Sequence, residues 1–380
     1  MVNEYNDIEI DSVESFIHEI YEFTSGCQLY KEIIDKFIEQ EWDKSDSYYS
    51  SWILNEFLKF IDLYQYKERI NSSADEITYL YNTFYNELEK IKTKVNKKTE
   101  AKIISFVKEV IKDASKNEDF ITSRRAFIQY YYRGESNKNW NYRPSIMRDD
   151  HTYSRESYFY HEIQVRCPNE FENLSFLDKL VKMQHYGCST RLLDITSNPL
   201  GALYFACEER ENDGRISIFP IINGTMSYGD SDKALILSCL PHLKKNEQNL
   251  IIEELKSLNG QEYNNSSNHP YLEKLYLEIC SEKPAFQRRI EPGDILSPLF
   301  IQPNRANPRI TNQQGAFLLS GLSSDLEEAE KKIKARIAKT RFVVKSEKKE
   351  RILEELDLLA INKASIYPNM EKTAEYIKSH

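Results

Sequence analysis

The first third of the chain has a helical pattern of apolar residues. From about residue 11 to 115, Gly and Pro are almost absent and apolar residues recur at steps of three and four. Apolar stripes of this kind occur at residues 14–40, 75–95 and 101–112. We therefore predict a helical N-terminal domain over residues 1–118. The apolar face of residues 75–95 consists of Ile77, Leu80, Tyr81, Phe84, Leu88, Ile91 and Val95.

Two roles fit these N-terminal helices. They either bury one edge of the domain that follows, or they form a module that docks a protein partner or gates that domain. The pattern of apolar positions is compatible with both roles.

The pattern changes after a polar stretch at residues 113–119. Short strand-like runs then alternate with helical stretches at 155–165, 174–186, 197–211 and 246–258. Because strands and helices mix without a strict βαβ rhythm, we predict an α+β domain over residues 119–380, with helices at its C-terminal end. The predicted strands are 126–132, 215–219, 234–237 and 315–319.

Composition and charge narrow the functional classes. Hydrophobic residues make up 40% and charged residues 29% of the chain, a balance typical of globular proteins. The net charge of −9 argues against broad charge-driven binding to nucleic acid. Lysine-rich runs at 92–98 and 331–336 give nucleic-acid binding modest support, although such runs are also typical of solvated helix faces.

Several features of the sequence predict a cytoplasmic protein without a metal site. The acidic N-terminus lacks the basic and apolar regions of a secretory signal, and no apolar run is long enough to span a bilayer. The six cysteines show neither a CxxC pair nor zinc-ligand spacing. We therefore expect a cytoplasmic protein with reduced cysteines, no membrane contact and no metal site.

The first candidate site motif is Arg133-Gly134, at the end of a predicted strand. An arginine there offers a planar fork of donors to a phosphate or carboxylate, and the glycine lets a ligand approach the backbone. This combination indicates an anion site. The alternative is a structural salt bridge between Arg133 and a carboxylate such as Asp194.

A second group of candidates lies at the end of the helix predicted at 176–187. Gln184 and His185 fall on its last turn, and Gly187 suits the residue that terminates a helix. Either side chain is placed to reach a ligand. His185 also fits the alternative of a buried, hydrogen-bonded histidine.

The segment that follows contains Thr190, Arg191 and Asp194 in an otherwise apolar strand. Burying either charge unpaired would cost roughly 3–5 kcal/mol. The two therefore pair with each other, with other site residues or with a ligand. Thr196 or Ser197 is predicted to cap the next helix, whose free N-terminal amides would form an anion site that includes Asn198.

The last candidate is Gln314, which follows a polar loop with two prolines and precedes the strand at 315–319. The loop is either a turn that closes the sheet or a segment that places Gln314 at the mouth of the same cleft.

Taken together, these motifs resemble the FRG domain family, which is named after its aromatic-Arg-Gly motif. The likeness runs from about residue 122 to 320 and includes Tyr132-Arg133-Gly134, Gln184 to Asp194, Asn198 to Ala206 and Gln314 to Phe317. Two positions depart from the family pattern, with Glu135 in place of Gln and Ser189 in place of Pro. The resemblance implies a bacterial or phage protein, and Glu135 would add a carboxylate to its site.

The order of elements is also similar to that of ADP-ribosyltransferases of the Arg-Ser-Glu type. This analogy implies a small, mainly antiparallel sheet and NAD or another nucleotide as the ligand. Arg133 would then hold a diphosphate, and Thr190 and His185 would position the ribose. Those transferases use a late Glu to stabilise the transition state, whereas Gln313-Gln314-Gly315 stands here, so Glu135 or Asp194 would have to supply the charge.

Three functional hypotheses follow. The first is an NAD- or nucleotide-dependent transferase or glycohydrolase in phage defence, with Glu135, His185 and Asp194 as catalytic residues and Arg133, Gly134, Gln184, Thr190, Arg191, Asn198 and Gln314 as ligand contacts. The second is a non-catalytic nucleotide sensor that signals to the N-terminal helices. The third is a nucleic-acid-processing enzyme. The chain lacks a P-loop, a GxGxxG fingerprint and an HExxH helix, which argues against ordinary NTPases, Rossmann dehydrogenases and zincins.

Overall fold

The computed structural model describes residues 5–24, 128–222, 225–258, 263, 269–304, 308–338 and 340–379. Most of the predicted N-terminal helices, the lysine run at 92–98 and the predicted domain boundary at residue 118 lie outside these ranges. The chain divides into two compact units. One comprises Met1–Lys138, Ala202–Asn223 and Ala335–Leu359, and the other comprises Asn139–Gly201, Gly224–Lys334 and Ala360–His380.

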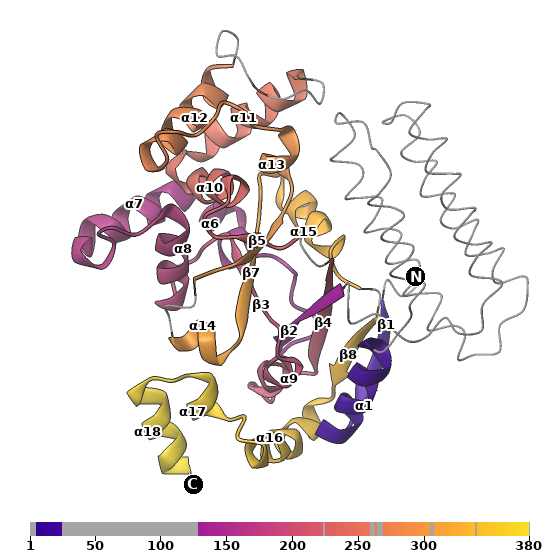
Figure 1. The fold of residues 1–380 in the computed structure, drawn as a ribbon. Coiled ribbons are helices and arrows are strands. Elements are labelled where there is room, and N and C mark those ends of the chain that lie inside the picture. The colour runs from indigo at the N-terminus through magenta and orange to yellow at the C-terminus, as the bar shows by residue number, and fades with distance from the viewer. Residues whose placement is uncertain are drawn as a thin grey trace, which may run out of the picture. The chain divides into compact units, whose positions relative to one another are not determined.

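The first unit contains strands in the order β1-β8-β4-β2 (Figure 1). β1 (Asn6–Ile10) is parallel to β8 (Thr340–Val344), and β4 (Gly214–Ile222) is antiparallel to β8 and to β2 (Ile128–Glu135). Helices α1 (Val13–Thr24) and α16 (Lys349–Leu358) pack together in this unit. Its core includes the edge-to-face pair Phe16 and Phe342, with ring centroids 5.4 Å apart.

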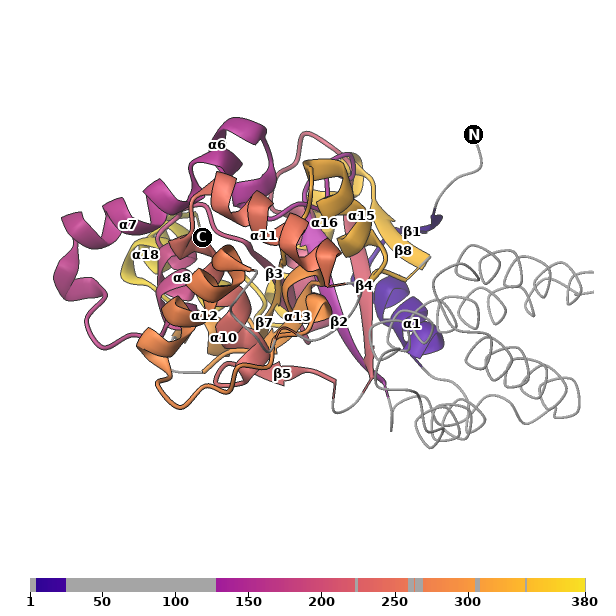
Figure 2. The same ribbon diagram turned by 90° about the horizontal axis from the view of Figure 1, so that it is seen from above.

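The second unit contains strands in the order β3-β7-β6-β5. β7 (Gly315–Leu319) is antiparallel to both β3 (Leu192–Thr196) and β6 (Leu299–Gln302), and β5 (Ser227–Tyr228) is parallel to β6. Figure 2 shows its helices from above, among them α10, which packs against α8 and α12. The described helices of this unit are α6 (Asp150–Ser154), α7 (Glu156–Arg166), α8 (Phe176–His185), α10 (Asp232–Cys239), α11 (Lys245–Ser257), α12 (Pro270–Glu282), α13 (Pro292–Leu296), α14 (Pro308–Asn312), α15 (Leu326–Lys334), α17 (Lys363–Ile366) and α18 (Met370–Ser379).

Most predicted elements of the α+β region are confirmed, but two expectations were wrong. The expected small, mainly antiparallel sheet was wrong, because the described residues already contain eight strands and their pairings are mixed, with β1–β8 and β5–β6 parallel. The run 234–237, predicted as a strand, belongs to helix α10. Every residue of this run is buried, so it lacks the polar alternation that separates a strand from a helix. The Ser231 hydroxyl accepts a hydrogen bond from Ala234 N and caps the helix.

Two glycines let helix α9 (Pro199–Cys207) approach strands β2 and β4 closely. A Cβ atom added to Gly134 would lie 1.8 Å from the carbonyl oxygen of Ala202, and one added to Gly214 would lie 2.1 Å from that of Ala206. No side chain fits at such distances, because protein interiors are already close-packed. Gly134 was expected to make room for a ligand. In the structure its missing side chain makes room for the helix backbone.

His242 is packed within the core of the second unit. Its ring lies 4.3 Å from that of Phe176 between centroids, and its Nε2 is 2.9 Å from the hydroxyl of Tyr160. Burial lowers the pKa of His242 to about 4, and electrostatic interactions with His161 and Lys179 act in the same direction. The folded protein therefore holds this histidine neutral.

We expect Gly134→Ala to destabilise the protein, because the new methyl group would force α9 away from β2. The free energy of unfolding should fall by at least about 2 kcal/mol, measured by urea denaturation. Gly201→Ala, within α9 itself, is the control. Its added Cβ would meet nothing closer than 3.7 Å, so stability should be unchanged or rise by up to about 1 kcal/mol. Equal effects of the two substitutions would show that close packing at Gly134 is unimportant.

The buried His242 predicts a loss of stability in mild acid. In the unfolded chain a histidine ionises near its usual pKa of about 6.5, so between this value and about 4 only the unfolded state binds the proton. The stabilisation is present above pH 6.5 and is lost as pH falls toward 4, by about 3 kcal/mol in total. His242→Gln should flatten the slope of unfolding free energy against pH in this window. An unchanged slope would contradict this account.

Candidate functional site

In the first unit, the candidate Arg133 lies near the C-terminal end of β2, in a cluster of three charged side chains. Arg133 Nε donates to Glu135 Oε1 at 3.1 Å, and Arg215 donates to Glu135 Oε2 through Nε at 2.7 Å and through Nη2. The pairing follows from the strand register, which places Glu135 opposite Arg215. The side chains of Glu135 and Arg215 are each 3% exposed and that of Arg133 is 14% exposed. Glu135 is thus a buried carboxylate shared by two guanidiniums.

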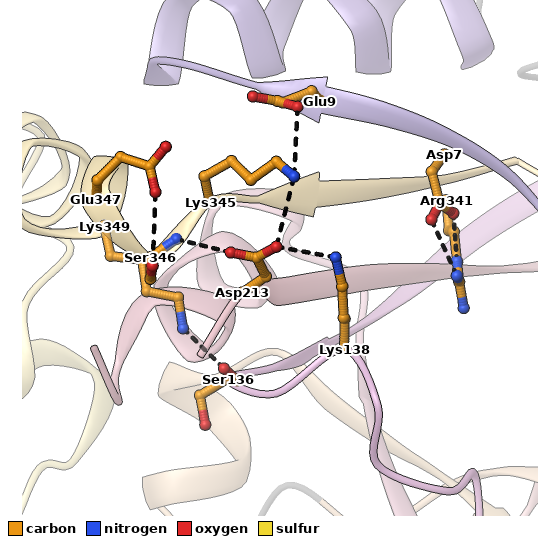
Figure 3. Close-up of polar contacts among 10 residues, drawn as sticks. All are labelled: Asp7, Glu9, Ser136, Lys138, Asp213, Arg341, Lys345, Ser346, Glu347 and Lys349. Carbon is orange, nitrogen blue, oxygen red and sulfur yellow. Dashed lines mark hydrogen bonds and ion pairs between the residues drawn. The ribbon is translucent and has the colours of Figure 1, made fainter. Parts of the chain in front are cut away.

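A second polar network holds this end of β2 to the neighbouring strands (Figure 3). Arg215 Nη1 donates to the carbonyl oxygen of Lys138 at 2.8 Å, and Lys138 Nζ donates to Asp213 at 2.9 Å. Asp213 also accepts from Ser346 N at 3.1 Å, and Lys345 Nζ lies 3.5 Å away. The pKa of Asp213 is lowered, mainly by the hydrogen bond from Lys138. These contacts fix the backbone that carries Arg133 and Glu135.

In the second unit, Gln184 and Thr190 lie together. The Thr190 hydroxyl donates to Gln184 Oε1, and Thr190 N donates to Ser145 Oγ at 3.0 Å. Thr190 is 1% exposed. As predicted, α8 ends just before Gly187, which has φ +82. The two polar candidates therefore form a buried link between the end of α8 and the start of β3.

His185, on the last turn of α8, has a polar atom without a partner. Its Nδ1 is buried and makes no hydrogen bond in the part of the chain that the structure describes. Burial lowers the pKa of His185, and the charge of Arg309 adds to this effect. His185 is therefore a largely neutral side chain with one buried nitrogen that makes no hydrogen bond among the described residues.

Arg191 is fully buried and pairs with Glu156, a residue that was not among the predicted site residues. Its Nε donates to Glu156 Oε1 at 2.8 Å, its Nη2 donates to Oε2, and its Nη1 donates to the carbonyl oxygen of Ser320 at 3.1 Å. Gln248 Nε2 also donates to Glu156, at 3.2 Å. Of the alternatives left open by the sequence, this geometry favours a structural ion pair over a ligand contact for Arg191.

The remaining candidates lie in β3, just after it, and immediately before β7. Asp194 is exposed in the middle of β3. The Ser197 hydroxyl lies 3.3 Å from Gln314 Oε1, and Gln314 has φ +48. A residue other than glycine in this left-handed region is strained, and such strain is concentrated at functional sites. The second unit thus brings Gln314 beside the end of β3.

Asn198 is the residue that caps α9, where Thr196 or Ser197 was expected. Its Oδ1 accepts from the backbone amides of Leu200 at 3.0 Å and Gly201 at 3.2 Å. The Thr196 hydroxyl instead accepts from Asn198 N and donates to the carbonyl oxygen of Gln313. Because Asn198 already binds two amides of the first turn, its oxygen is committed to the helix rather than to a ligand.

Comparison with known proteins identifies one family. Residues 128–215 match the family model of the FRG domain, which confirms the resemblance in the sequence. The matched segment begins at the first residue of β2, ends in β4 at Arg215 and contains every candidate except Gln314. No curated protein and no solved structure matches the chain.

Among the residues that the structure describes, no helix is both long and apolar enough to cross a membrane. Among the same residues, no group of three or more His, Cys, Asp or Glu side chains is arranged to hold a metal ion.

The buried pair of Arg191 and Glu156 yields a stability prediction. Glu156→Gln would leave the Arg191 guanidinium buried without a carboxylate, which should lower the free energy of unfolding by about 3 to 5 kcal/mol. The matched control is Glu162→Gln on the same helix. Glu162 pairs with Arg166 at the surface, so its loss should cost less than about 1 kcal/mol in urea denaturation. Similar losses from both variants would contradict a structural role for Arg191.

Proposed function

We propose that the FRG segment binds a phosphate-containing small molecule, a nucleotide or NAD, and that Arg133 contacts its phosphate. The observation that carries this proposal is the charge cluster at the end of β2. It contains two guanidiniums and one carboxylate, and Arg133 is its most exposed member. An anion at this position would meet a donor fork that matches phosphate geometry.

The surroundings of Arg133 favour a preformed site. Its Nε is engaged by Glu135, and Glu135 is itself held by Arg215. A side chain oriented in this way loses little conformational entropy when a ligand binds. Gly134 and the network of Asp213 fix the backbone on either side.

Binding without turnover is the function that the geometry supports best. Both oxygens of Glu135 accept hydrogen bonds from guanidiniums, so its negative charge is already neutralised within the fold. A carboxylate in this position is a poor stabiliser of a positively charged transition state. The domain would then act as a nucleotide sensor that passes its signal to a protein partner through the predicted N-terminal helices.

A second candidate is an ADP-ribosyl transferase or NAD glycohydrolase. The exposed carboxylate of Asp194 on β3 favours it, because this side chain is accessible to a bound substrate. His185, with its unpartnered Nδ1, would complete this catalytic proposal. A cytoplasmic role in phage defence is the biological setting that the FRG resemblance suggests for either candidate.

Nucleic-acid processing gains no support from Lys332 and Lys334, which belong to the lysine-rich run at 331–336. Lys332 and Lys334 of α15 form ion pairs with Glu328 at 2.9 Å and with Glu330 at 3.6 Å. These pairs lie along one helix, as expected of a solvated helix face.

The proposed phosphate contact can be tested by calorimetry with NAD and a panel of nucleotides. Arg133→Ala should weaken binding of the preferred nucleotide by about tenfold to a hundredfold, the worth of a charge-assisted hydrogen bond to phosphate. Arg210→Ala is the matched control, because Arg210 belongs to the same unit but forms an exposed ion pair with Glu350. This variant should bind like the wild type.

The same samples distinguish the two candidates. Nucleotide binding without product supports the sensor. The enzyme is supported if the wild type releases nicotinamide from NAD and the Asp194→Asn variant does not. Equal binding by the Arg133→Ala and Arg210→Ala variants, or no binding to any nucleotide, would refute the proposed site.

A further inference from the structure

The second unit contains a hollow of about 520 Å³ that shares no residue with the candidate site. It is lined by the end of α6, by α7 and by the start of α11, and we call it the α7–α11 hollow. Its volume falls within the range of small-molecule sites, which is roughly 300–1,000 Å³.

The charges that line the α7–α11 hollow are unbalanced. Arg155, Lys244 and Lys245 contribute three positive charges, and none of them forms an ion pair within the described residues. The one carboxylate of the lining, Glu162, is engaged by Arg166 at 2.6 Å. Since cations without partners attract anions, the hollow is electrostatically suited to a negatively charged ligand.

Lys245 is the most unusual of these cations. Its Nζ is buried, lies 3.7 Å from the centre of the Tyr153 ring and makes no hydrogen bond in the described part of the chain. The neighbouring carboxylate of Glu156 is already bound by Arg191, and the other acidic group that acts on Lys245 is Asp150. Burial, followed by the charge of Arg191, lowers the pKa of Lys245 to about 8. A positive charge therefore lies beside the hollow without full compensation.

The lining also offers a surface for a planar ring. Tyr158 is 48% exposed, and the guanidinium of Arg155 lies 4.8 Å from the centre of its ring. Val165, 75% exposed, adds an apolar contact on the same helix. A stacked guanidinium and aromatic ring form a surface on which a nucleobase can lie.

We propose that the α7–α11 hollow binds a phosphomonoester that carries a planar ring, the class to which nucleoside monophosphates belong. The dianionic phosphate would lie among Arg155, Lys244 and Lys245, and the ring would lie on Tyr158. This site is independent of Arg133, so the chain would hold two ligand sites with different residues.

Calorimetry with AMP and with inorganic phosphate tests this proposal on the full chain. AMP should bind more tightly than inorganic phosphate, and Tyr158→Ala should remove most of that difference. Lys244→Met should weaken AMP binding by about tenfold or more, the loss of one charge-assisted contact. Lys245→Met should also weaken it, because the buried Nζ of Lys245 acts on the phosphate through its charge rather than by direct contact. Lys244 is exposed, so its substitution tests the site without disturbing the fold. Lys256→Met on the same helix, where Lys256 pairs with Glu253, should bind like the wild type.

A second measurement reports on Lys245 itself. Because the bound dianion would raise the pKa of Lys245, AMP binding near pH 8 should take up protons, which appears as a dependence of the binding heat on the buffer. The uptake should vanish in Lys245→Met. Arg133→Ala should keep both the AMP affinity of this site and the proton uptake, which separates it from the site at β2. Equal AMP affinity in Lys244→Met, Lys245→Met and Lys256→Met, or no saturable binding of either probe, would overturn the proposal.

Discussion

The close contact between helix α9 and strands β2 and β4 is the constraint on which the Arg-Gly motif depends. A methyl group at Gly134 or Gly214 would overlap the backbone of α9, so glycine at both positions allows the helix to lie directly on the strands. The small residues Ala202 and Ala206 on the helix meet these glycines. Gly134 thereby sets the position of the residues on either side of it, Arg133 and Glu135.

Buried ion pairs then determine what the charged motif residues can do. Glu135 is held by Arg133 and Arg215, and Glu156 is held by Arg191 and Gln248. Removing one partner of such a pair is far more costly than removing both, so each pair constrains its neighbours. Both carboxylates serve the fold. Under the proposed function, the ligand would contact Arg133, which is more exposed than Glu135, and the candidate enzyme would use the exposed Asp194 and His185.

Local patterns in the sequence predicted much of the fold but few of the contacts. The strand at Arg133, the helix that ends before Gly187 and the strand at Gly315 followed from apolar spacing and helix-terminating residues. The run 234–237 of helix α10 was predicted as a strand because it is fully buried and has no polar face. The partner of Arg191 could not be predicted, since Glu156 lies 35 residues away and on a different element. Likewise, nothing in the local pattern showed that Gly134 faces a helix.

The account of the candidate site rests on Arg133 as the contact for a phosphate. A crystal structure of the full chain with a bound nucleotide tests this most directly. We predict a phosphate oxygen within hydrogen-bonding distance of the Arg133 guanidinium, with Glu135 still held by Arg215. A nucleotide bound with its phosphates elsewhere, and with Arg133 in contact only with protein groups, would contradict the account.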